Sequence, residues 1–97
     1  MKTLEEIKQA LASQKERLRE EYQVEELRIF GSYVRKEADG GRDTDILVEF
    51  SKPISLFTFL ELEDHLSNVL DVPVDLVPKH GLKPGIRNRV LAEAVTV

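Results

Sequence analysis

The segment "GSYVRKEADGGRDTDILVEF", residues 31–50, places two aspartates at the start of an apolar run that is typical of a β-strand. Residues 46–48 are consecutive apolar residues, which predicts a strand covered on both faces, near the centre of a sheet. Side chains two residues apart on a strand project from the same face, so we expect Asp43 and Asp45 side by side, with Thr44 pointing away. Two carboxylates held together favour a bound cation, and hard divalent ions such as Mg²⁺ bind carboxylate oxygens.

The glycine-serine pair that opens this segment is typical of a phosphate-binding turn. Gly31 lets the backbone approach a phosphate closely, and exposed amides together with the Ser32 hydroxyl can donate hydrogen bonds to it. One turn further on stand Arg35 and Lys36, of which Arg35 has the planar guanidinium suited to phosphate oxygens. We therefore expect Gly31, Ser32 and Arg35 to contact a nucleotide. The alternative is that the side chains of Arg35 and Lys36 are ordinary surface charges.

The rest of the chain alternates helical and strand patterns. The expected elements are a helix over 3–21 with Thr3 as N-cap, a strand over 24–30, one or two helical turns within 32–38, a strand over 44–50, a helix over 55–70, a strand over 72–78 and a helix over 84–94. The apolar stripe expected on the helix over 55–70 consists of Leu56, Phe59, Leu60, Leu66 and Leu70. The order αβ(α)βαβα predicts one α+β (α/β) domain over residues 1–97.

A third carboxylate, Asp75, lies alone among apolar neighbours in "VPVDLVP", where a buried strand would carry Val, Ile or Leu. If its strand is a neighbour of the strand over 44–50, one face holds Asp43, Asp45 and Asp75 together. Such a trio can bind two Mg²⁺ ions, about 3.5–4 Å apart, that clamp the attacking and leaving oxygens of a phosphoryl group. One of the carboxylates can then accept the proton of an acceptor hydroxyl.

Composition narrows the classes of function. The 97-residue chain has a formal net charge of −4, so it offers no broad basic surface to a nucleic-acid backbone. It contains no cysteine, which excludes disulfides and thiolate zinc sites and agrees with a reducing cytoplasm. The N-terminus is too charged for a signal peptide and no apolar run approaches the length of a membrane span, so we expect a soluble protein without membrane contact.

The motifs resemble a known family. Gly31-Ser32, ten further residues and then Asp43-Thr44-Asp45 resemble the GS-x10-DxD signature of the DNA polymerase β-like nucleotidyltransferase superfamily, and the short chain resembles its minimal nucleotidyltransferases. The stretch "GSYVRKEA" looks like the family's "GSxARGxA", "VDLV" looks like its third-aspartate strand, and "IRNRVLAEAVTV" looks like its C-terminal segment. Lys36 replaces a common glycine and Arg42 replaces a common serine, departures that concern the local loop.

The resemblance implies a small mixed β-sheet packed by helices, with ATP and magnesium bound at the Gly31-Ser32 corner and AMP transferred to a side-chain hydroxyl. Minimal members commonly act in the prokaryotic cytoplasm as antitoxins of HEPN-domain ribonuclease toxins, which they silence by adenylylating a hydroxyl, with tyrosine as the expected acceptor. On that pattern Asp43, Asp45 and Asp75 are the catalytic and metal-binding residues. ATP is the substrate, two Mg²⁺ ions are the cofactor and the toxin is the partner protein.

Simpler interpretations exist for single features. A glycine-serine pair alone is usually only a turn, and the order and spacing of the three motifs favour the nucleotidyltransferase site. His65 and His80 are expected at the surface rather than as metal ligands. The group Phe57, Phe59 and Leu60 is most simply core packing, although it could meet a partner.

The alternative function is a non-catalytic antitoxin that neutralises the toxin by stoichiometric binding.

Overall fold

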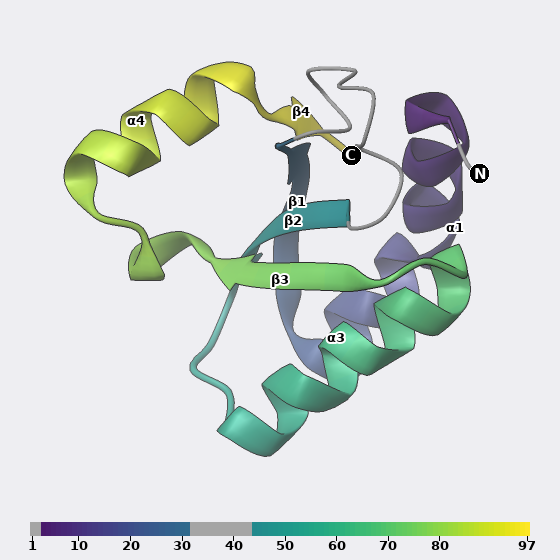
Figure 1. The fold of residues 1–97 in the computed structure, drawn as a ribbon. Helices are drawn as coiled ribbons and strands as arrows, with labels where there is room; N and C mark the ends of the chain where they lie inside the picture. The colour runs from purple at the N-terminus through teal and green to yellow at the C-terminus, as the bar shows by residue number, and fades with distance from the viewer. Residues whose placement is uncertain (1–2, 32–43) are drawn as a thin grey trace.

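The computed structural model describes residues 3–31 and 44–97. Within these ranges lie α1 (Leu4–Tyr22), β1 (Val24–Phe30), β2 (Thr44–Phe50), α3 (Leu56–Leu70), β3 (Val74–Pro78), the 3₁₀ turn η1 (Lys79–Gly81), α4 (Pro84–Glu93) and β4 (Val95–Thr96) (Figure 1). The predicted helices and strands are found within two residues of their expected limits. The helical turns predicted within 32–38 lie outside the described residues.

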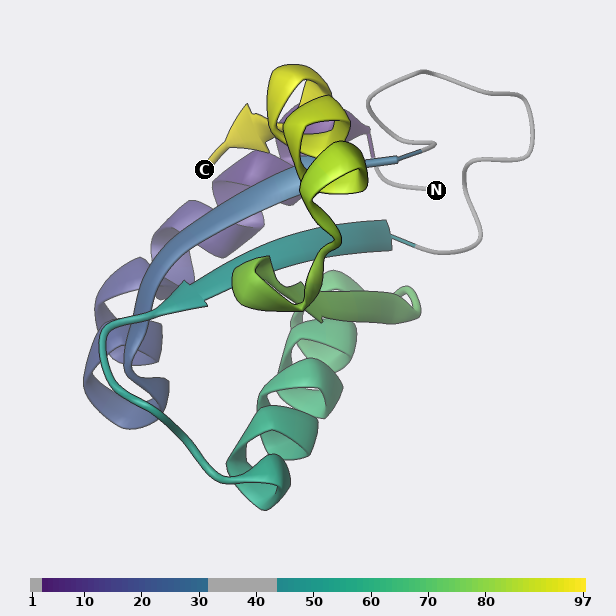
Figure 2. The same ribbon diagram turned by 90° about the vertical axis from the view of Figure 1, so that its left-hand side faces the viewer.

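The four strands form one mixed sheet in the order β3-β2-β1-β4. β1 pairs antiparallel with both β2 and β4, whereas β2 and β3 are parallel and are connected through α3 (Figure 2). The small mixed sheet and the central place of β2 are confirmed. The sequence prediction missed β4, which has two residues and is followed by a hydrogen bond from the Val97 amide to the Leu27 carbonyl (3.0 Å).

Helix α1 begins at a capping box. The Thr3 hydroxyl accepts a hydrogen bond from the Glu6 amide (3.2 Å), and the Glu6 carboxylate accepts one from the Thr3 amide (3.2 Å). The helix ends at Gln23, whose φ of 60° places it in the left-handed region. The predicted N-cap is thus confirmed, and the apolar stripe of α1 is buried against the sheet and α3.

Helix α3 faces the core through part of the predicted stripe: Phe59, Leu66 and Leu70 are confirmed, and Leu62 was missed. The Ser55 hydroxyl caps its start by accepting from the Thr58 amide (3.2 Å). The side chains buried in α3 are those of Leu62, Leu66 and Leu70. Leu56 and Leu60, which the prediction placed in the stripe, are 71% and 50% exposed. The first turn of α3 extends past the strands (Figure 1), and Leu60 lies about 100° round the helix from Phe59, away from the buried side.

The aromatic residues at the start of α3 also divide. Phe59 is partly buried and packs edge-to-face on Phe50, with ring centroids 6.2 Å apart. Phe57 is 81% exposed, so the core interpretation is wrong for Phe57 and Leu60 and holds for Phe59.

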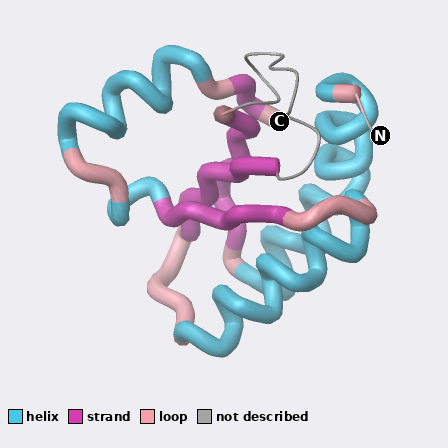
Figure 3. Tube along the Cα trace, viewed as in Figure 1, coloured by secondary structure: helices cyan, strands magenta, loops and turns pink. Residues whose placement is uncertain are grey.

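The core lies between one face of the sheet and the helices α1 and α3, which contact each other (Figure 3). Its buried members are Ile7, Leu11, Leu18, Val24, Leu27, Ile29, Ile46, Val48, Leu62, Leu66, Leu70, Val74 and Leu76. Helix α4 stands apart from α1 and α3 and has no buried residue. In the two described ranges, no helix is both long enough and apolar enough to cross a membrane.

Candidate active site

The parallel pairing of β2 and β3 sets two predicted site residues next to each other. Asp45 is the register partner of Asp75, and neighbouring strands lie about 4.8 Å apart. Thr44 and Ile46, on either side of Asp45, are buried on the core face, so Asp45 projects from the opposite face, which is not covered by α1 or α3 and which we call the open face. The expectation that Thr44 points away and that the two strands are neighbours is confirmed.

Asp75 lies on the same open face, between the buried residues Val74 and Leu76. Its side chain is exposed, so a polar residue at this position follows from ordinary strand alternation and needs no functional reason. The register of Asp75 with Asp45 is the stronger indication of a functional site. Like charges directly opposite each other across strands are destabilising, and positive charge from a side chain or a cation relieves that cost.

Gly31 lies directly against the Asp45 carboxylate. It follows Phe30, the register partner of Asp45 on β1, and it is buried with a φ of +80°, in the left-handed region that favours glycine. A Cβ atom at this position would overlap Asp45 Oδ2 and would lie 3.0 Å from Cγ and 3.2 Å from Cβ of the same side chain. The absence of a side chain at Gly31 therefore makes room for the Asp45 carboxylate.

Half of the predicted site can be placed. Asp45, Asp75 and Gly31 converge at one end of the sheet, whereas Ser32, Arg35 and Asp43 lie outside the described residues. The described part of the chain contains no group of three acidic or histidine side chains that could hold a metal ion. Two carboxylates on adjacent strands are the donors that Mg²⁺ prefers, so the described residues fit such an ion, with Asp43 as the predicted third ligand.

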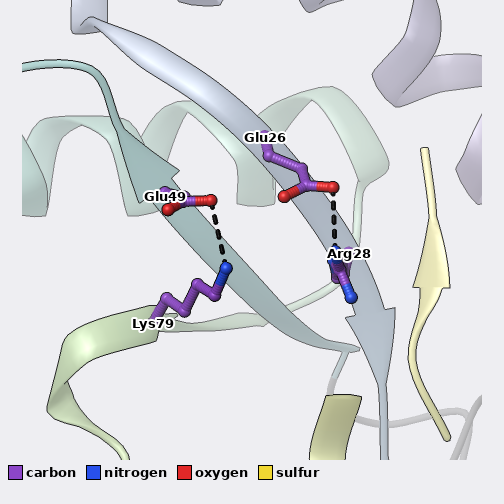
Figure 4. A network of polar contacts seen from close by, with 4 residues as sticks. All are labelled: Glu26, Arg28, Glu49 and Lys79. Carbon is purple, nitrogen blue, oxygen red and sulfur yellow. Dashed lines mark hydrogen bonds and ion pairs between the residues drawn. The ribbon is translucent and has the colours of Figure 1, made fainter. Parts of the chain in front are cut away.

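The open face carries a second charged group further along the strands. Glu26 of β1 and Glu49 of β2 are register partners, and each has a basic neighbour (Figure 4). Arg28 Nη2 lies 3.1 Å from Glu26 Oε1, and Lys79 Nζ lies 3.3 Å from Glu49 Oε2. These pairs compensate the acidic residues locally, so this group has the character of a surface ion-pair network.

The two histidines have no part in the acidic end of the sheet. His65 is half-buried rather than at the surface: its ring stacks on Tyr22 at 5.9 Å, and its Nε2 lies 3.4 Å from Gln14 Oε1. These contacts join α3 to α1. His80 is exposed, as predicted.

An apolar pocket of about 760 Å³ opens where β2 and β3 end, at the opposite end of these strands from Asp45 and Asp75. The apolar side chains that line it are those of Phe50, Pro53, Ile54, Leu56, Phe59, Leu76 and Pro78. It is therefore separate from the acidic site. The pocket was not predicted from the sequence, because it forms only where residues 50–59 meet residues 76–80 in the fold.

The two strand-borne aspartates and the glycine turn beside them belong to a known kind of domain. A model of the nucleotidyltransferase domain matches residues 11–97, so this chain is a member of the nucleotidyltransferase domain family. That match includes every strand of the sheet and all three predicted site motifs.

The more particular resemblance is to small adenylyltransferases. The chain is 50% identical over 97 residues to the protein adenylyltransferase MntA of Thermococcus cleftensis, covering 100% of this chain and 98% of that protein. It is 32% identical to a solved structure provisionally described as a minimal nucleotidyltransferase, with a TM-score of 0.74 and coverage of 94% and 95% of the two chains. The predicted likeness to minimal nucleotidyltransferases is confirmed.

A solved complex shares the fold at lower identity. It contains the tri-AMPylated HEPN toxin of Shewanella oneidensis and an MNT antitoxin, and one of its chains matches with a TM-score of 0.67 at 22% identity. The match covers 93% of this chain and 70% of that one. At this identity the likeness shows a common fold.

Proposed function

We propose that this protein transfers AMP from Mg-ATP to a side-chain hydroxyl, with tyrosine as the expected acceptor, on a HEPN ribonuclease toxin and thereby acts as its antitoxin. The observation that carries the proposal is the register of Asp45 with Asp75, beside a glycine that leaves room for the Asp45 carboxylate. The full-length likeness to a named protein adenylyltransferase supports the reaction class. The fold shared with an antitoxin bound to an AMPylated HEPN toxin supports the partner.

In the proposed reaction, the acceptor hydroxyl oxygen attacks the α-phosphorus of ATP. The bond from that phosphorus to the oxygen bridging to the β-phosphate breaks, pyrophosphate leaves, and the hydroxyl proton passes to Asp75. Asp43, Asp45 and Asp75 are the proposed ligands of two Mg²⁺ ions, which when bound supply positive charge at the attacking and leaving oxygens. Gly31 and Ser32 would hold the departing pyrophosphate, and Arg35 would contact the triphosphate.

The second candidate is an antitoxin that neutralises the toxin by binding alone. The exposed apolar residues at the start of α3, Leu56, Phe57 and Leu60, favour a contact surface of some kind on this protein. In this case the nucleotidyltransferase fold would serve as a scaffold, and neutralisation would need neither ATP nor the aspartates.

A ribonuclease assay of the toxin separates the two candidates. The toxin is incubated with this protein in the presence and absence of ATP and magnesium, and with the variant Asp43→Asn, Asp45→Asn. We expect inhibition of RNA cleavage only with the wild type, ATP and magnesium together. Inhibition by the variant without ATP would overturn the catalytic proposal in favour of stoichiometric binding.

A further inference from the structure

Strand β3 is an edge of the sheet, and its outward amides would be unpaired without help from another element. Two side chains of α3 supply that help. The Val74 amide donates to Ser67 Oγ (3.1 Å) and the Leu76 amide donates to Glu63 Oε2 (2.9 Å). These two amides belong to the residues immediately before and after Asp75.

The two acceptors form one unit on α3. Glu63 and Ser67 are four residues apart and therefore lie on the same side of the helix. The Ser67 hydroxyl also donates to the Glu63 carbonyl (3.0 Å), which fixes the hydroxyl while it accepts from Val74. A carboxylate that accepts from an amide makes a stronger hydrogen bond than a neutral acceptor, so Glu63 is expected to hold Leu76 firmly.

This arrangement bears directly on Asp75. Its strand is bonded to β2 along one edge and to α3 along the other, so its backbone is held from both sides. Asp75 itself projects from the open face beside Asp45 and makes no contact with α3 in these bonds. We infer that Glu63 and Ser67 are positioning residues that hold the β3 backbone so that Asp75 stays in register with Asp45.

The inference rests on the proposed function, in which Asp45 and Asp75 bind magnesium and receive the acceptor proton. Displacement of a catalytic group by about 1 Å can reduce a rate roughly a hundredfold. Loss of the Glu63 contact should therefore lower kcat and weaken Mg²⁺ binding in protein that is still folded. A role limited to covering the sheet edge would change stability or solubility alone.

The test compares Glu63→Ala, Glu63→Gln and a matched control, Glu61→Ala, which removes the same charge from an exposed position on the same helix. Three quantities are measured for each: kcat for AMP transfer, the binding of Mg²⁺ with a non-hydrolysable ATP analogue by calorimetry, and Tm. We expect Glu63→Ala to lower kcat about ten- to a hundredfold and to raise the Mg²⁺ Kd severalfold. Glu63→Gln keeps an acceptor oxygen for Leu76, so it and the Glu61 control should stay within about twofold of the wild type.

Unchanged Mg²⁺ binding in Glu63→Ala, or an equal loss in Glu63→Gln, would overturn the inference. If Glu63→Ala does not fold, Ser67→Ala is measured in its place. It should show the same lower kcat and higher Mg²⁺ Kd, whereas Glu63→Gln should stay close to the wild type. Absence of AMP transfer by the wild type would instead reject the proposed function. The calorimetric comparison would still decide whether Glu63 supports the Asp45 and Asp75 pair.

Discussion

At the scale of single residues, Gly31 and Asp45 constrain each other. Gly31 adopts a φ of +80°, and any side chain at this position would meet the Asp45 carboxylate. A glycine-serine pair read from sequence suggests backbone approach to a phosphate, and the fold adds a second requirement, space for a carboxylate of the same site. The backbone angle and the nearby Asp45 carboxylate thus require glycine at this position, independently of the predicted phosphate contact.

The substitution Gly31→Ala tests this contact. A left-handed conformation costs a non-glycine residue roughly 1–2 kcal/mol, and the added methyl group would displace the Asp45 carboxylate as well. We expect AMP transfer to fall at least tenfold while far-UV circular dichroism stays that of the wild type.

The matched control is Gly85→Ala in α4, where an added Cβ has no atom within 4 Å. That change should leave transfer unaffected and should raise stability by up to about 1 kcal/mol, since alanine favours a helix over glycine. Equal transfer by Gly31→Ala and wild type would show that the position of the Asp45 carboxylate does not limit the reaction.

At the scale of elements, α3 combines a buried C-terminal part with an exposed N-terminal part. From Leu62 onward its leucines are buried against the sheet, whereas Leu56 and Phe57 face solvent. Helical spacing predicted the existence and ends of α3 correctly. It could not show which leucines are covered, because that depends on where the strands end beneath the helix, a tertiary property.

A matched pair of leucine substitutions tests this division of α3. Leu66 is fully buried and Leu60 is 50% exposed, so the same change, leucine to alanine, should have different costs. We expect Leu66→Ala to lower the free energy of unfolding by about 2–5 kcal/mol and Leu60→Ala by well under 1 kcal/mol. Urea denaturation measures both values, and comparable losses would contradict the packing of α3 described above.

At the scale of the whole molecule, the sequence predicted the helices and the first three strands better than it predicted the arrangement of the sheet. Apolar runs and helix caps are local signals, so β2 and the N-cap Thr3 were found directly. The pair Val95–Thr96 is too short to carry a strand pattern, and it is a strand only because β1 lies beside it.

The same limit applies to the site. From the sequence, Asp45 and Asp75 are expected side by side only if β2 pairs with β3. The structure shows this pairing. The hydrogen bonds from the amides on either side of Asp75 to Glu63 and Ser67 could not be predicted, because an acid and a serine four residues apart on a helix usually face solvent. The roles of all the predicted site residues stay predictions: Gly31, Ser32, Arg35, Asp43, Asp45 and Asp75.

The most direct test of the central claim is the intact mass of a candidate HEPN toxin after incubation with this protein, ATP and magnesium. The variant Asp43→Asn, Asp45→Asn is run beside the wild type as the control. We predict that the toxin gains the mass of one or more AMP units with the wild type and none with the variant. An unchanged toxin mass, in a stable complex with the wild-type protein, would contradict AMP transfer and show that this protein acts on the toxin by binding alone.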